Sequence, residues 1–171
     1  ITGNALDLNG TSTTVTLPAS TFASIGDQIT IAMWVNGGDM PPRGFNILSA
    51  EDASGKVLGI LLPYGSGVVY WDHGINIRPE RISKAATPDQ YKGAWNHWVF
   101  TKNRATGVMN IYHNGALFQT GIRKKATIGT ITSASIGGSE QQRYDGAIDN
   151  VRVYKKALSA AEVKELYLKK K

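Results

Sequence analysis

The sequence predicts an all-β sandwich or barrel, and three observations indicate it. Apolar and polar residues alternate at period two along most of the chain, which is typical of half-buried strands. Glycine or Asx turns separate nearly every such run, and the chain has 19 glycines against 6 prolines. Only the last stretch of the chain has helical spacing. Short strands at regular spacing with turns between them favour a sandwich or a barrel.

The expected strands follow one another from the first residues to the last quarter of the chain. The segment 27–38 shows the pattern clearly, because Ile29, Ile31 and Met33 alternate with the residues between them. Asn114 and Gly115 supply the strongest turn signal, since both tolerate the positive φ angles of a type I′ hairpin. The period-two runs are 4–10, 14–18, 27–38, 45–52, 56–62, 66–74, 95–103, 108–115, 116–121, 130–138 and 146–154.

Two segments differ from this pattern. Residues 76–94 form the longest polar connection, which is either a functional rim loop or contains a hidden strand. Residues 159–168 are expected to form a short helix, because Ser159 and Glu162 have the spacing of a capping box. A basic tail follows at 169–171, and we expect residues 1–171 to form a single domain.

Composition narrows the classes of function. The chain has 171 residues, 42% of them apolar, and no cysteine, so disulfides and thiolate metal sites are excluded. No apolar run reaches the roughly 18 residues of a membrane span. The formal charge of +6 favours anionic partners such as acidic glycans, although solubility alone would also explain it. The chain begins at Ile1, so we expect a mature fragment or excised domain of a larger protein.

Several motifs together resemble one known family. The motifs are ALDLNGTSTTVTLP, ITIAMWV, WNHWVFT, IYHNGAL and IDNVRVYKKALSAAEVKELY. In this order they resemble the laminin-G-like, concanavalin-A-like jelly-roll domains of bacterial secreted proteins, over nearly the whole chain. The last motif is the most specific. The resemblance implies two stacked antiparallel sheets with a curved face, and a short C-terminal helix. Relatives include glycan-binding modules, pentraxin-like domains, adhesin modules and family-16 glucanases.

The resemblance also implies a structural calcium. Asp149 interrupts the apolar start of the last expected strand, where an unpaired carboxylate would be costly. In the family an Asp at the matching position often ligates calcium, which takes six to eight oxygen ligands. The expected carbonyl donors are Asn9 and Gly55. The alternative is that Asp149 caps a turn or pairs with Arg152 or a lysine.

Motifs for catalysis are missing. The family-16 enzymes carry a Glu-x-Asp-x-x-Glu strand with two carboxylates spaced for glycoside hydrolysis, and nothing in this sequence matches it. Glu51 and Asp52 are adjacent and would point to opposite faces of a strand. No Gly-x-Ser-x-Gly elbow accompanies the three histidines. We therefore expect a protein that is not an enzyme, with a divergent hydrolase or lyase as the least favoured alternative.

The segment YWDHGINIRPER is the richest candidate for a ligand site. An aromatic plane flanked by fixed polar groups suits sugars, and arginine suits carboxylate or sulfate. By alternation Tyr70 and Asp72 share one face, whereas Trp71 and His73 share the other. The sequence leaves open which pair faces the core. The loop GGSEQQRYDG is a second polar candidate, so the predicted ligand-binding residues are Trp71, Asp72, His73, Arg78, Arg81, Glu140 and Arg143.

Together these features favour a non-catalytic carbohydrate-binding module of a secreted or cell-surface protein. Its partner would be a polysaccharide, with an acidic or sulfated glycan favoured by the basic charge. The alternative is an adhesin-type interaction or spacer domain without a sugar site. Nucleic acid is not expected, because no reader motif accompanies the charge.

Overall fold

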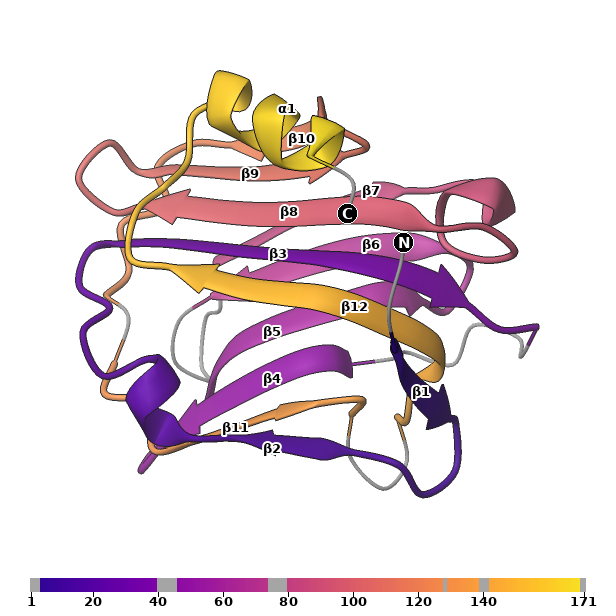
Figure 1. Ribbon diagram of the computed structural model, residues 1–171. Helices are drawn as coiled ribbons and strands as arrows, with labels where there is room; N and C mark the ends of the chain where they lie inside the picture. The colour runs from indigo at the N-terminus through magenta and orange to yellow at the C-terminus, as the bar shows by residue number, and fades with distance from the viewer. Residues whose placement is uncertain (1–3, 40–45, 74–79, 128, 139–141, 170–171) are drawn as a thin grey trace.

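Two antiparallel sheets stack face to face in the computed structural model, which describes residues 4–39, 46–73, 80–127, 129–138 and 142–169 (Figure 1). The first sheet has the order β1-β12-β3-β8-β9-β10, and the second has β2-β11-β4-β5-β6-β7. This arrangement confirms the predicted two-sheet sandwich. The strands are β1 (Leu6–Asn9), β2 (Val15–Leu17), β3 (Gln28–Gly37), β4 (Asn46–Asp52), β5 (Gly55–Tyr64), β6 (Val68–His73), β7 (Glu80–Ala85), β8 (Asn96–Asn103), β9 (Val108–His113), β10 (Ala116–Gly121), β11 (Ser133–Ile136) and β12 (Asp145–Tyr154).

The core lies between the inner faces of the two sheets. Alternation along each strand sends one set of apolar side chains inward, where large aromatic rings meet. Phe100 of β8 lies 5.8 Å from Trp71 and 6.4 Å from Trp98, measured between ring centroids. All three side chains are fully buried. Burial of this kind supplies most of the driving force for folding.

The long polar connection at 76–94 contains a strand, so the second of its two interpretations is right. Strand β7 pairs with β6 and forms an edge of the second sheet. Two short 3₁₀ turns, Ala19–Thr21 and Pro88–Gln90, connect other strands. The predicted hairpin at Asn114 and Gly115 is present, with φ angles of 49° and 80° between β9 and β10.

The helix α1 (Ala160–Leu168) packs on the outer face of the first sheet (Figure 1). Ser159 is its N-cap, and the Ser159–Glu162 capping box is present as predicted. Val163 is fully buried against Ala32, Val99 and Tyr112. Since α1 is the only α-helix among the described residues, no such helix covers the outer face of the second sheet.

Candidate functional site

Strand β6 decides which side chains of YWDH face solvent. Trp71 and His73 are both fully buried, whereas Tyr70 is half-buried on the outer face of the second sheet. The Trp71 ring packs on Phe100, and its Nε1 donates to the Thr101 carbonyl at 3.2 Å. Trp71 is therefore a core residue, and the predicted sugar platform on its ring is wrong.

His73 is likewise a core residue. Its side chain is fully buried, and neither ring nitrogen has a hydrogen-bond partner among the described residues. Burial, with a smaller contribution from the nearby Lys102 charge, lowers the pKa of His73 to about 3. The ring is therefore neutral at physiological pH and is not available to a ligand.

Asp72 and Arg81 face outward and hold each other. They lie directly opposite in register on β6 and β7. Arg81 Nε and Nη2 donate to the two oxygens of the Asp72 carboxylate, each at 2.6 Å. The Arg81 guanidinium also lies 4.5 Å above the centroid of the Tyr70 ring. The carboxylate of Asp72 and the ring of Tyr70 together fix the plane of the Arg81 guanidinium. A guanidinium is the group that proteins favour for binding planar anions.

Lys56 of β5 provides a second cation on the same face. Its Nζ donates to Asn46 Oδ1 at 2.8 Å, and Asn46 Nδ2 in turn donates to Gln142 Oε1 at 3.0 Å. Burial lowers the pKa of Lys56, and the Asp72 carboxylate partly offsets that effect. The direct hydrogen-bond partner of Lys56 is thus a neutral amide, although its ammonium is partly desolvated.

These residues line a groove of about 260 Å³ on the outer face of the second sheet. Tyr64, at 43% exposed, lies edge-on to Tyr70 with ring centroids 5.5 Å apart. The groove combines one exposed aromatic ring, two cations and one carboxylate, a composition suited to a small polar ligand. Its lining residues are Asn46, Lys56, Leu61, Tyr64, Tyr70, Asp72, Arg81 and Gln142.

Of the five predicted ligand-binding residues that the structure describes, only Asp72 and Arg81 line this groove. Arg143 instead donates from Nη1 to the Ser12 carbonyl at 3.2 Å. Arg78 and Glu140 lie outside the described residues. Their roles stay predictions.

The predicted calcium ligands do not meet in one site. Asn9 of β1 pairs with Asp145 of β12. Asp145 precedes Asp149 by four residues, so Asn9 and Asp149 are separated by about 13 Å along the strand direction. Gly55 begins β5 in the other sheet. Asp149 Oδ1 accepts from the backbone N–H of Asn150 at 2.6 Å, where β12 bulges and Asn150 has a φ of +52°. The set Asp149, Asn9 and Gly55 therefore does not fit one calcium ion.

Side chains offer no alternative metal cluster in the described part of the chain. Groups of three or more His, Cys, Asp or Glu that could hold a metal ion do not occur there. Asp149 closes a strand bulge instead, which is close to the turn-capping alternative.

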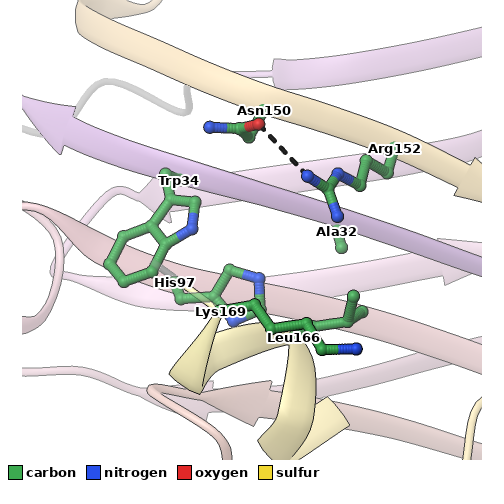
Figure 2. A pocket seen from close by; sticks show the side chains of 7 residues that line it. All are labelled: Ala32, Trp34, His97, Asn150, Arg152, Leu166 and Lys169. Atoms are coloured by element: carbon green, nitrogen blue, oxygen red, sulfur yellow. Dashed lines mark hydrogen bonds between the residues drawn. The ribbon is translucent and has the colours of Figure 1, made fainter. Parts of the chain in front are cut away.

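A second pocket lies beneath α1 on the outer face of the first sheet (Figure 2). Trp34 stacks on Tyr167, and its ring centroid lies 5.0 Å from that of His97. Asn150 Oδ1 accepts from Arg152 Nη2 at 3.4 Å. The cavity has a volume of only about 10 Å³, roughly enough for one water molecule. It is a small packing defect between α1 and the sheet rather than a ligand site.

Sequence reasoning missed most of the groove. Lys56, Asn46 and Gln142 come from two strands and a loop, and no local motif connects them. Tyr64 comes directly after the buried residues of β5, and no sequence motif marked it as a binding residue. The alternation of β6 was the one usable signal, because it had already placed Tyr70 beside Asp72.

Comparison with protein families gives a match over most of the chain. A family model described as the concanavalin A-like lectin/glucanases superfamily matches residues 9–164. Comparison with curated protein sequences gives no match.

Solved structures with the same fold include several binding domains. The binding domain of botulinum neurotoxin serotype G aligns with a TM-score of 0.79 at 20% identity, over 98% of this chain and 43% of that chain. The CBM40 domain of the Ruminococcus gnavus IT-sialidase, bound to α2,3-sialyllactose, aligns with a TM-score of 0.77 at 15% identity, over 96% and 97%. Domain 4 of AbnA, an extracellular arabinanase of Geobacillus stearothermophilus in complex with arabinotriose, gives 0.72 at 21%, over 97% and 77%.

These identities are low, so the alignments show a shared fold. The chain spans less than half the length of the neurotoxin binding-domain chain. No helix in the described part of the chain is long and apolar enough to cross a membrane.

Proposed function

The chain belongs to the concanavalin A-like lectin/glucanase superfamily, and from that premise we propose that it is a non-catalytic carbohydrate-binding module for acidic glycans. The groove on the outer face of the second sheet is the proposed binding site. Neighbours of the same fold include domains solved with sialyllactose and with arabinotriose. The observation that carries the proposal is the pairing of an exposed aromatic ring with a partly desolvated lysine.

The charges of the groove favour an anion. Among its lining residues Lys56 and Arg81 are cationic and Asp72 is anionic, so one positive charge is left over. Asp72 forms its two short hydrogen bonds with Arg81, whereas Lys56 donates to an amide. A carboxylate or sulfate at Lys56 Nζ would restore the favourable contacts that burial removes.

The aromatic and amide groups suit the rest of a sugar. Tyr64 offers an exposed ring to an apolar C–H face, and its orientation is held by the edge contact with Tyr70. Asn46 and Gln142 offer amide donors and acceptors to sugar hydroxyls.

The same groove does not favour hydrolysis. Glycoside hydrolysis commonly needs two carboxyl groups flanking the bond, one of them able to donate a proton. Asp72 is the only carboxylate that lines the groove among the described residues, and both its oxygens accept from Arg81. Binding without turnover is therefore the proposed role.

The wider context is part of the proposal. A basic module of this family fits a secreted or cell-surface protein that acts on or adheres to polysaccharide. The structural neighbours of the neurotoxin type are parts of longer chains, which is consistent with a multidomain parent. Calcium stays a separate prediction from the family resemblance.

The test is a titration of acidic and neutral glycans against the wild type and Lys56→Met. Acidic glycans should bind, and Lys56→Met should weaken them about tenfold to a hundredfold, the worth of one charge-assisted hydrogen bond. The matched control is Lys155→Met, which removes an exposed lysine that follows β12 and does not line the groove. If no glycan binds, the spacer alternative replaces this proposal, and if acidic glycans bind both variants equally, the groove is not their binding site.

A further inference from the structure

One row of residues crosses the second sheet at right angles to its strands. Directly opposed residues of paired strands share a face, so the row can be followed from one edge of the sheet to the other. Adjacent strands lie about 4.8 Å apart, which gives the row a length of about 24 Å. Its members, in spatial order from β2 to β7, are Thr16, Ser135, Ser49, Gly59, Asp72 and Arg81.

The half of the row on β2, β11 and β4 is lined with hydroxyl groups. The Oγ atoms of Ser49 and Ser135 lie 3.2 Å apart and share a hydrogen bond. They line a second hollow of about 180 Å³, which is separate from the cationic groove. The hollow is lined by Thr16, Ser49, Glu51, Ser133, Ala134 and Ser135. Every hydroxyl can both donate and accept, which matches the hydroxyls of a neutral sugar.

Lys56 lies between the two hollows. Gly59 occupies the centre of the row, and a Cβ added there would lie 2.5 Å from Lys56 Cε and 2.9 Å from Lys56 Nζ. The missing side chain of Gly59 therefore leaves the space that the lysine occupies. Lys56 itself lines the cationic groove, and because Gly59 is directly opposite Ser49, the ammonium is about one strand spacing from the hydroxyl hollow.

The two hollows differ in charge. Among the described residues that line the hydroxyl hollow, Glu51 is the only ionisable one, and its side chain is exposed. A second acidic sugar placed there would meet a like charge, which is unfavourable. The cationic groove has the opposite preference, since Lys56 and Arg81 outnumber Asp72.

We propose that the hydroxyl hollow is a second saccharide subsite and that the protein binds an internal stretch of a glycan chain in which acidic and neutral units alternate. The acidic unit lies over Lys56, and the neutral unit lies in the hollow beside Glu51. The chain runs across the strands along the row rather than parallel to them. This inference rests on the proposed function and adds the length, direction and repeat of the ligand.

The test uses three probes on the same protein by isothermal titration. Glucuronate is the single acidic unit, hyaluronan oligosaccharides alternate acidic and neutral units, and polygalacturonate oligosaccharides are acidic at every unit. We expect hyaluronan hexasaccharide to bind at least tenfold more tightly than glucuronate, because it occupies both hollows. The affinity of polygalacturonate oligosaccharides should exceed that of glucuronate by a smaller factor, and Glu51→Gln should increase that factor.

The double variant Ser49→Ala and Ser135→Ala isolates the second subsite. It should remove the gain of hyaluronan over glucuronate and leave glucuronate binding unchanged. Ser20→Ala, at an exposed serine away from the row, is the matched control, and thermal melting shows whether each variant is folded.

The outcomes separate the two proposals. Glucuronate binding that depends on Lys56, with no gain on lengthening or a gain that the double variant keeps, would overturn the second subsite alone. An equal gain for hyaluronan and polygalacturonate would overturn the alternating repeat. Absence of binding by all three probes would overturn the acidic-glycan function, and the subsite with it.

Discussion

Lys56 shows how the surroundings of a single residue make it a candidate for binding. An exposed lysine is strongly hydrated and gains little from one more anion. Lys56 instead lies across Gly59, partly buried, with Asn46 Oδ1 as its hydrogen-bond acceptor at 2.8 Å. Burial lowers its pKa, so the charged form is less favourable than in water. An incoming carboxylate would reverse this cost, which is the reason for proposing that the groove selects anionic ligands.

A prediction follows for the pH dependence of binding. The pKa of Lys56 is lowered from its ordinary value of 10.5, so Lys56 loses its proton earlier than an exposed lysine on alkaline titration. Anion binding requires the charged form, and affinity should therefore fall as pH rises, beginning below 10.5. Calorimetry in buffers of different ionisation enthalpy should detect proton uptake on binding in that range. The Lys56→Met variant should show no such uptake.

Asp149 gives the second residue-scale prediction. Its carboxylate accepts the N–H of Asn150 inside the bulge of β12, which supports a left-handed residue at that position. Asp149→Ala should therefore lower the free energy of unfolding by about 1 kcal/mol, the worth of one such bond. The loss should be the same with calcium and with EDTA. A calcium-dependent rise in melting temperature that only the wild type shows would restore the metal role of Asp149.

Element-scale organisation is clearest at α1. The capping box begins the helix, and Lys156 Nζ reaches the Glu162 carboxylate at 2.7 Å. These contacts, with the Lys156 hydrogen bond the largest, lower the pKa of Glu162 to about 2. The helix then buries Val163 against the outer face of the first sheet. Its packing covers part of that face, at β3, β8 and β9, while the proposed binding row lies on the other sheet.

Truncation of the helix contact should separate stability from binding. Val163→Ala removes two methyl groups from a fully buried side chain and should cost about 2 kcal/mol of unfolding free energy. Glycan affinity should be unchanged, because the groove residues belong to the other sheet and to the loop at Gln142. Urea denaturation and titration check the two parts, with the exposed Lys164→Ala as control. A matching loss of affinity would contradict the separation of the two faces.

At the scale of the whole molecule, the two histidines with the most strongly lowered pKa values lie in buried packing interfaces rather than in the groove. His73 lies between the sheets, near the charged Lys102. His97 lies beneath α1, where burial, and then Arg152 and His113, lower its pKa to about 4. Each histidine is neutral in the folded state over a range in which the unfolded chain binds a proton.

Stability should therefore fall on acidification. Both folded pKa values lie below the ordinary 6.5, so the unfolded state holds more protons between 6.5 and about 4 or 3. Above pH 6.5 the two histidines should make no pH-dependent contribution to the free energy of unfolding. Below pH 6.5 each should lower that free energy by up to about 1.4 kcal/mol per pH unit. His97→Phe keeps a ring against Trp34 and removes one titration, so its slope in urea denaturation should be smaller. An unchanged slope would argue against His97 as a source.

Local sequence determined the type and boundaries of most elements. The hairpin at Asn114 and Gly115 and the capping box of α1 depend on residues that are neighbours in the chain, and both formed as predicted. Alternation also determined that Tyr70 and Asp72 share a face, because side chains of a strand point to opposite sides in turn. It did not determine which face of the strand is buried, because side chains alternate in the same way whichever face packs against the core.

Tertiary structure decided which face is buried and built the candidate site. Trp71 became buried because Phe100 and the Thr101 carbonyl, distant in sequence, receive its ring and its N–H. The row from Thr16 to Arg81 exists because the registers of five strand pairs coincide, and register is fixed by hydrogen bonds between separate segments. A sequence pattern carries the period of each strand, whereas the alignment of one strand with the next is a property of the folded chain alone.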